Sequence, residues 1–470
     1  MVQAYGVEKG WVQPGNSPMK ALTEYVARAI GRELPREVME KARIHILDTI
    51  AACVSGMALD AGLQARRYVD AFMGPAQATV VASSLRTSMP YAALANGMAA
   101  HADETDDSLA PLGQIRTHPG CSIIPSAVAV AEAEGRSGEE LMRAVALGYD
   151  ICGRITMALW SDIDTPHLEQ SSAAVGGLFG SAAAAGALLG LDAQQCRHLL
   201  SYAVQQSSGL STFFRGRQHV EKAFVFAGMP AFNGTMVATM VKAGWTGVED
   251  VFIGRPSFFT LGPRPDPDQL TDGLGERYDL LRTKLKKYPA GSPLQSPLDA
   301  LLMLLDEERL VAREVQSLVV KLSPPRLQTC YDRDMSDLNV EYLIHVALHD
   351  GGITLDSAHD QVRFEQWRAQ PRDARIKVVG DESLGVSHSA SVALVTVDGR
   401  KFDRFIKEIP GSPANPLSLA VIEAKARGLL EPTLGEERTV GLVRDMARLE
   451  ELDRVADLMS WLQVADSDTR

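Results

Sequence analysis

Apolar and small residues recur at helical spacing through the first two-thirds of the chain. Between residues 35 and 56, such side chains follow one another at intervals of three or four, which places them on one face of a helix. They are Val38, Ala42, Ile46, Thr49 and Ala52. Alanine-rich runs of the same kind cover residues 91–100, 124–134, 138–155, 193–206 and 230–243. The pattern therefore predicts a large domain built from helices.

After about residue 288 the pattern changes to short runs of β-branched residues bounded by turn residues. These runs predict strands at 315–322, 376–379, 391–396 and 402–406. The sequence VDGR at 397–400 predicts a hairpin turn between the last two. A further short strand is expected within 78–84, and helical spacing returns at 416–430 and 439–462.

The order of these elements predicts a mainly α fold. We expect a large all-helical domain at residues 1–275, a smaller α+β lid domain at 276–408, and C-terminal helices at 409–470 that return to the helical domain. A cleft between two such domains is a common place for a small-ligand site.

One segment, residues 173–191, contains nineteen residues without a charge, which is long enough to cross a membrane. Its residues are mostly alanine and glycine, and Glu169 and Asp192 flank it. Small side chains let neighbouring backbones approach closely. We therefore expect a helix buried inside a bundle and no membrane partner.

Charge and cysteine content narrow the class of function. The 470 residues carry a formal charge of −12, which argues against binding to nucleic acid. The five cysteines are scattered without a CxxC pair, as expected for a reduced cytoplasmic protein without a structural zinc site. The N-terminal residues show no basic start followed by an apolar run, so no signal peptide is expected.

The densest group of polar residues follows the predicted helix at 91–100 and continues to the His118-Pro119 pair. Within it, closely spaced carboxylates raise one another's pKa, as acid–base sites require. The group includes His101, Asp103, Glu104, Asp106, Asp107, Ser108 and His118. Two alternatives stay open: a solvated acidic loop, or a divalent-metal site that uses His101, Glu104, Asp106 and Asp107, although their spacing matches no established metal motif.

Several residues elsewhere could complete a site for an anionic substrate. Lys222 lies near Arg215 beside an aromatic run, and these cations could bind a carboxylate. The alternative is a solvated first helical turn. Tyr149 ends a long apolar helix and could supply a phenol, or be a buried structural tyrosine. Lys287 and Gln295 mark the predicted domain junction.

These motifs, taken in order, resemble the MmgE/PrpD family along nearly the whole chain. The matching segments are LDTIA at 47–51, NG at 96–97, HA at 101–102, DDS at 106–108, HP at 118–119, GYD at 148–150, FGSAAAA at 179–185, KYP at 287–289 and PGSP at 410–413. The resemblance implies a helical domain with an α+β lid, a homodimer, no cofactor, no metal, and chemistry on small polycarboxylates.

The resemblance also implies roles for individual residues. His118 stands at the family's catalytic histidine, Glu104 and Ser108 at positions usually held by an acid and a threonine, and Lys222 near the substrate-binding lysine. The spacing from Lys222 to Gly228 is one residue longer than in the family. Two histidines of the family pattern are replaced, by Ser171 and by Gln295.

The resulting prediction is a metal-independent lyase of the 2-methylcitrate dehydratase type. His118, Tyr149, Glu104 and Ser108 are expected to be catalytic; the expected substrate-binding residues are Asp106, Asp107, Lys222, Arg215, Lys287 and Gln295. A base near neutral pKa would remove a proton next to a carboxylate, and cations would stabilise the resulting aci-carboxylate.

Other reactions and other classes of protein stay open. Return of the proton to the opposite face would make the protein an epimerase, and loss of CO2 would make it a cis-aconitate-type decarboxylase. The replaced histidines favour the epimerase over either lyase. A metal-dependent hydro-lyase and a non-catalytic carboxylate-binding protein are the remaining alternatives.

Overall fold

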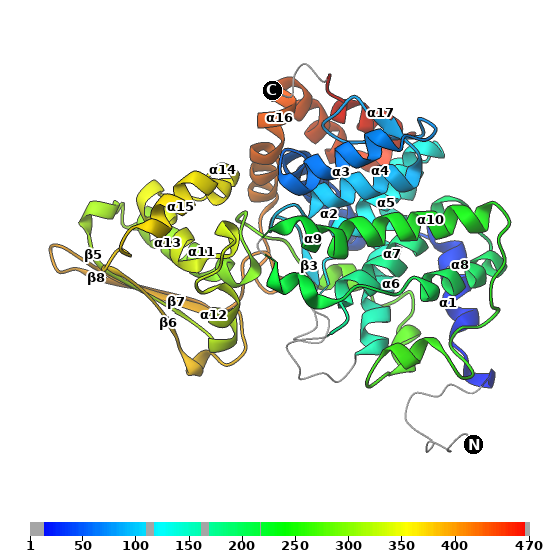
Figure 1. The fold of residues 1–470 in the computed structure, drawn as a ribbon, viewed down its shortest axis with the longest axis horizontal. Helices are drawn as coiled ribbons and strands as arrows, with labels where there is room; N and C mark the ends of the chain where they lie inside the picture. The colour runs from blue at the N-terminus through cyan, green and yellow to red at the C-terminus, as the bar shows by residue number, and fades with distance from the viewer. Residues whose placement is uncertain (1–13, 110–116, 161–168, 217, 466–470) are drawn as a thin grey trace. The chain divides into compact units, whose positions relative to one another are not determined.

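The computed structural model describes residues 14–109, 117–160, 169–216 and 218–465, apart from the side chain of Phe214. Helices make up most of these residues, so the predicted mainly α fold is confirmed (Figure 1). The chain forms two compact units. The first unit contains Met1–Ala102, Asp106–Thr283 and Leu429–Arg470, and the second contains Asp103–Thr105 and Lys284–Gly428. The lid role and the domain limits expected at 275 and 408 stay predictions.

The first unit is a bundle of helices. Its members are α1 (Met19–Arg28), α2 (Arg36–Gly56), α3 (Asp60–Ala71), α4 (Met89–Ala100), α5 (Gly120–Ala133), α6 (Gly138–Leu159), α7 (Ser172–Leu188), α8 (Ala193–Gln205), α9 (His219–Ala223), α10 (Met229–Lys242) and α17 (Val455–Met459). The predicted helices at 35–56, 91–100, 124–134, 138–155, 193–206 and 230–243 are thus confirmed.

Helix α7 lies at the centre of this bundle, and every one of its residues is buried. It packs against α6 through two glycines: a Cβ added to Gly180 would lie 2.6 Å from the carbonyl oxygen of Gly148. Close approach of this kind needs small residues on both helices. The buried helix expected at 173–191 is therefore confirmed.

A different segment has the length and apolar composition of a membrane span. It is His219–Lys242, which joins α9 to α10 and is mostly buried inside the structure. The bent pair of α2 and α3 would raise the number of such segments among the described residues to two. Core helices of ordinary globular proteins pass the same test.

The second unit is built around a four-stranded sheet in the order β6-β5-β7-β8. Strands β5 (Val315–Leu322) and β6 (Ile376–Gly380) are parallel, whereas β7 (Ala390–Thr396) is antiparallel to both β5 and β8 (Lys401–Ile406). All four predicted strands are therefore confirmed. The predicted turn at 397–400 is also present, and its Gly399 has a φ of 87°, which glycine adopts without strain.

Helices accompany this sheet and complete the core of the unit. They are α11 (Ser292–Glu307), α12 (Pro324–Cys330), α13 (Val340–Asp350), α14 (Leu355–His359) and α15 (Gln361–Ala369). Alternate residues of β7 are buried, and α11 packs against β7, β8 and α13. Apolar residues of the sheet and helices form one continuous core.

The last long helix, α16 (Leu419–Ala447), begins in the second unit and ends in the first. The predicted break between the helical segments at 416–430 and 439–462 corresponds to a kink at Gly435, whose φ is 75°. The strand expected within 78–84 is only two residues long (β1, Ala78–Thr79), and it pairs with β2 (Arg86–Thr87).

Candidate active site

Two polar stretches of the sequence meet between α4 and α5. Helix α4 ends at Ala100, and the chain then runs through the loop that contains the predicted acidic residues to β3 (Ser108–Leu109). Leu109 and Thr117 exchange two backbone hydrogen bonds of 2.9 Å. This pairing returns the chain to His118 just before α5 begins at Gly120. The local fold therefore places His118 beside the acidic loop.

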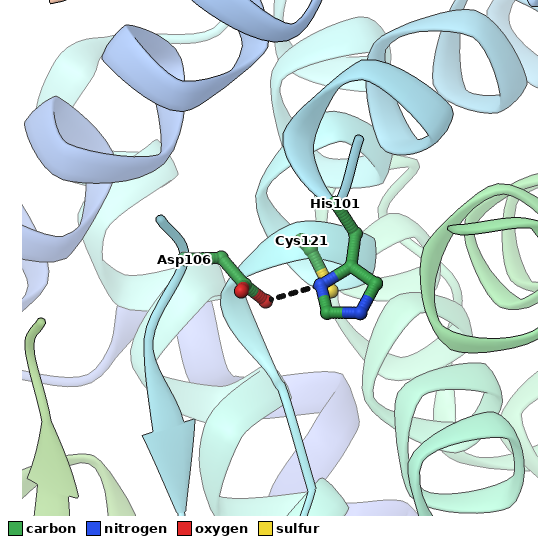
Figure 2. Close-up of side chains that lie close together, drawn as sticks. All are labelled: His101, Asp106 and Cys121. Atoms are coloured by element: carbon green, nitrogen blue, oxygen red, sulfur yellow. Dashed lines mark ion pairs between the residues drawn. The ribbon is translucent and has the colours of Figure 1, made fainter. Parts of the chain in front are cut away.

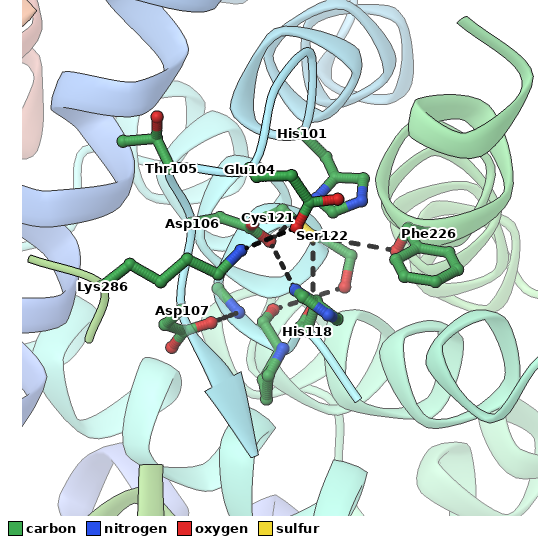
Figure 3. Close-up of polar contacts among 12 residues, drawn as sticks. His101, Glu104, Thr105, Asp106, Asp107, His118, Cys121, Ser122, Phe226 and Lys286 are labelled. Atoms are coloured by element: carbon green, nitrogen blue, oxygen red, sulfur yellow. Dashed lines mark hydrogen bonds and ion pairs between the residues drawn. The ribbon is translucent and has the colours of Figure 1, made fainter. Parts of the chain in front are cut away.

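Asp106 and His118 form a carboxylate–imidazole pair inside the first unit. Oδ2 of Asp106 lies 3.0 Å from Nδ1 of His118 (Figure 3). The same oxygen lies 3.0 Å from Nδ1 of His101 (Figure 2). Since an ionised carboxylate only accepts hydrogen bonds, the contact with His118 places a proton on Nδ1 and the lone pair on Nε2. This is the arrangement of a histidine prepared to take up a proton.

His101 is the more deeply buried of the two histidines. Burial lowers its pKa to about 3, and the positive charge of Lys222 acts in the same direction, against the opposing effect of Asp106. His101 is therefore neutral at physiological pH. Because it is uncharged, His101 can pack beside His118 and leave the negative charge of Asp106 to interact with His118.

An aromatic ring joins these histidines to a lysine. The ring of Phe226 stacks on His101 at a centroid distance of 4.8 Å and contacts His118 at 5.2 Å. Nζ of Lys222 lies 5.5 Å from the centroid of the same ring, within the range of a cation–π interaction. Lys222 itself is buried. The structure thus brings Lys222 and His118 to one aromatic side chain.

The segment between Lys222 and Gly228 has an unusual conformation. Residues Phe224–Gly228 form a π-helical turn between α9 and α10. A π-turn holds one residue more than an α-helical turn, and such turns are frequent at functional sites. The one-residue longer spacing from Lys222 to Gly228 that the family resemblance implies stays a prediction.

Asp107 forms a second buried group next to the first. Its Oδ2 accepts a hydrogen bond of 2.7 Å from the hydroxyl of Tyr149 and lies 2.7 Å from Nδ1 of His45. Its Oδ1 accepts the backbone N–H of Gly120 at 3.0 Å. Burial raises the pKa of Tyr149 well above its ordinary value and lowers that of His45. Asp107 therefore fixes the start of α5, two residues after His118.

The acidic loop also contributes to the second unit. There Oε2 of Glu104 lies 3.0 Å from Nζ of Lys286, and both side chains are buried (Figure 3). The neighbouring Lys287 instead pairs with Asp299 at 2.6 Å and is about 30% exposed. The sequence placed Lys287 in the site and left Lys286 unassigned, yet Lys286 is the buried one.

Gln295 is fully engaged with backbone groups of the second unit. Its Oε1 accepts from the N–H groups of Lys287 and Tyr288, and its Nε2 donates to the carbonyls of Tyr288 and Ala290. A buried amide with all these contacts holds the loop before α11 in place. Its expected role in substrate binding stays a prediction.

The remaining predicted residues occupy varied positions. Ser108 is buried in β3, whereas Arg215 is exposed in a short 3-10 helix. Ser171, which stands where the family resemblance implies a histidine, caps α7 by accepting the N–H of Ala174. The catalytic roles expected of Ser108, Glu104 and Tyr149, and the substrate-binding role of Arg215, stay predictions.

Three buried residues near His118 have a spacing that could hold a metal ion. One ligand atom each of His101, Asp106 and Cys121 lies within 4.8 Å of the others (Figure 2). Sγ of Cys121 already donates to the carbonyl oxygen of His118 at 3.1 Å. A metal here would have to compete with that contact and with the pairing of Asp106 and His118. The expectation of a metal-free site stays a prediction.

Sequence reasoning missed Phe226, His45 and Lys286. The helical spacing of residues 35–56 assigned His45 only to a helix, although its Nε2 lies 2.7 Å from the Thr283 hydroxyl. Phe226 carried no signal beyond the apolar run around it. Lys286 could have been weighed against Lys287, because the two adjacent lysines point in different directions on an extended chain.

Comparison with known proteins identifies the family of this chain. The MmgE/PrpD N-terminal domain model matches residues 20–264, and the C-terminal domain model matches residues 288–447. Cis-aconitate decarboxylase of Homo sapiens is 25% identical over 469 residues, covering 95% of each chain. The Mus musculus enzyme is 24% identical over 468 residues, covering 95% of this chain and 94% of its own. The cis-aconitate decarboxylase-like protein oryM of Aspergillus oryzae is 26% identical over 310 residues, 61% of each chain. The chain therefore belongs to the MmgE/PrpD family.

Proposed function

We propose that this protein is a lyase that acts on a small citrate-like polycarboxylate, with His118 as the group that transfers the proton. The observation that carries the proposal is the 3.0 Å contact between Nδ1 of His118 and Asp106. An imidazole oriented by a carboxylate is a common general base, because its free nitrogen keeps its lone pair. His118 is a better candidate for this role than Tyr149, whose pKa burial raises well above the usual value.

The proposed reaction is the elimination of water. Nε2 of His118 removes a proton from a carbon next to a carboxylate, and that carboxylate takes up the electron pair as an aci-carboxylate. The pair then forms the carbon–carbon double bond while the β-hydroxyl leaves with a proton as water. Glu104 and Ser108 are the proposed groups for assisting this departure, from the family resemblance.

Lys222 is the proposed cation for the substrate. It lies against the ring of Phe226, which also contacts His118, and its side chain is buried. A positive charge in a buried site stabilises developing negative charge more strongly than one in water. Neutral His101 suits this site, because a second buried cation beside Lys222 would raise the free energy of the folded protein.

Decarboxylation is the second candidate, and the relatives named as cis-aconitate decarboxylases favour it. In that reaction a protonated His118 gives a proton to a carbon of an unsaturated polycarboxylate. The bond between carbon and one carboxylate then breaks, and CO2 leaves. The electron pair of that bond forms a new carbon–carbon double bond, while the pair of the original double bond forms the new C–H bond. The replacement of two family histidines by Ser171 and Gln295 favours epimerisation instead, so the test includes that reaction as the third candidate.

The assembly, location and metal independence of the protein are also proposed. The homodimer rests on the family resemblance. A reducing cytoplasm suits the five cysteines, which are all buried and free. Light scattering coupled to gel filtration tests the dimer, and activity after exhaustive chelation tests the absence of a metal requirement.

The reaction is tested by proton NMR on purified protein in D2O with hydroxy-polycarboxylates and unsaturated polycarboxylates. The dehydratase is expected to convert a hydroxy acid to an alkene, whereas a decarboxylase consumes an unsaturated acid and releases CO2. Deuterium exchange without loss of water or CO2 identifies an epimerase. Tight binding with no turnover of any compound contradicts the enzyme and supports a carboxylate-binding protein.

A further inference from the structure

Helix α13 carries two histidines that lie one turn apart. His345 and His349 are at positions i and i+4, which share one face of a helix. Their ring centroids are 4.4 Å apart. Both belong to the second unit, and no residue of the candidate active site described above takes part in this pair.

A carboxylate from a different segment completes a group of three. Asp373 lies just before β6, and its Oδ2 is 3.7 Å from Nε2 of His349. One ligand atom each of His345, His349 and Asp373 lies within 4.8 Å of the other two. Ligands of a tetrahedral ion with bonds of about 2.0 Å lie roughly 3.3 Å apart, so small side-chain rotations would close the set.

The surroundings hold this group in place. Arg375 donates hydrogen bonds to both carboxylate oxygens of Asp373, from Nη2 to Oδ2 at 2.7 Å and from Nε to Oδ1 at 3.0 Å. A carboxylate still has lone pairs left for a metal, and such a partner fixes its orientation. Nδ1 of His345 is buried and has no hydrogen-bond partner among the residues that the structure describes.

A cavity of about 330 Å³ opens beside these ligands. Both His345 and Asp373 line it, together with Glu341, one helical turn before His345. The cavity gives an ion a route to the ligands and room for bound water. Arg372 also lines it, but its guanidinium lies 3.8 Å from the centroid of the Trp367 ring.

We propose that His345, His349 and Asp373 bind one divalent transition-metal ion of the zinc class. Two imidazoles and one carboxylate suit Zn²⁺, Co²⁺ or Ni²⁺, whereas Mg²⁺ and Ca²⁺ prefer sites made only of oxygen ligands. The bound ion joins α13 to the chain entering β6. Its role is to stabilise the second unit, and it takes no part in the proposed lyase reaction.

The test is a calorimetric titration of tag-free, chelator-dialysed protein with Zn²⁺. We expect one equivalent per chain, at least tenfold weaker binding in His349→Ala and in His345→Ala, and no comparable binding of Mg²⁺. Zn²⁺ should raise the Tm of the wild type but not that of His349→Ala, because only the native state binds. Since His349 is exposed, its replacement should leave the fold intact.

Cys121→Ser is the matched control, because Cys121 belongs to the second group of closely spaced potential ligands found among the described residues. This variant should still bind one equivalent of Zn²⁺ per chain. Co²⁺ bound to the wild type should show no thiolate charge-transfer absorption. The proposal is overturned if the wild type binds no equivalent, if His345→Ala and His349→Ala bind like the wild type, or if Cys121→Ser alone loses the ion.

Discussion

Oδ2 of Asp106 lies 3.0 Å from Nδ1 of His118, and both residues are buried in the first unit. This contact fixes which nitrogen of His118 is free for chemistry. The sequence predicted a catalytic role for His118 and, separately, a substrate-binding role for Asp106. Their pairing makes Asp106 a positioning residue in the proposed mechanism.

We expect Asp106→Asn to lower kcat by about 10- to 10³-fold, since an amide can hold His118 in the wrong tautomer. KM should change far less than kcat, and the pH profile of kcat should shift, because the charge beside His118 is gone. Steady-state kinetics across pH measures both. Asp299→Asn, which removes a carboxylate paired with Lys287, is the control, and an equal loss in both variants would contradict the positioning role.

Lys222 and Arg215 should differ as substrate-binding residues. Lys222 is buried against Phe226, whereas Arg215 is exposed, where screening by water weakens its attraction for an anion. We expect Lys222→Met to lower kcat/KM by about 10- to 100-fold, the loss of one charge-assisted contact. Arg215→Met should lower it less than about threefold. Kinetics that rank the two variants in the reverse order would overturn this assignment.

Gly120 has no room for a side chain. A Cβ there would lie 2.7 Å from the hydroxyl oxygens of Thr49 and Tyr149 and 2.9 Å from Oδ1 of Asp107. We expect Gly120→Ala to lower the free energy of unfolding by about 1–3 kcal/mol, the usual cost of overpacking. Gly428→Ala is the control, because nothing lies within 4 Å of its added Cβ. Urea titrations that show equal stability for both variants would contradict the close packing.

The stability of the protein should depend on the protonation of His101. Its pKa falls from an ordinary 6.5 to about 3 on folding because of burial, so the unfolded chain binds the proton more tightly. The stabilisation is therefore complete above pH 6.5 and is lost as the pH falls from 6.5 towards 3. Between pH 7.5 and 5.5 the wild type should lose about 1.4 kcal/mol more than His101→Gln. Urea titrations at the two pH values test this difference, and equal losses would contradict it.

Much of the fold followed from the sequence because its signals are local. Helical spacing placed α2, α4, α5, α6, α8 and α10, an uncharged run of small residues placed α7, and β-branched runs placed the four strands of the second unit. The length of β1 was predicted wrongly, because the extent of so short a strand depends on its pairing with β2. Gly435, with its positive φ, interrupts α16. The helical spacing predicted this interruption only as a gap between two helical segments.

The site was less predictable, because its contacts join distant segments. The acidic loop and His118 stood out through their residue types. The aromatic partner Phe226 is 108 residues from His118 and looks in the sequence like any apolar core residue. The choice between Lys286 and Lys287 depends on which side of the chain faces the interior, and residue type cannot decide that.

In the proposed reaction, His118 transfers a proton to or from the carbon of a polycarboxylate substrate. The most direct measurement is the rate of product formation in D2O, followed by proton NMR, for the wild type and for His118→Gln. The measurement temperature should lie equally far below the Tm of each protein. The variant is expected to lose at least about 100-fold in turnover, the usual contribution of a general base, on every substrate that the wild type converts. Turnover by His118→Gln at the wild-type rate would contradict it.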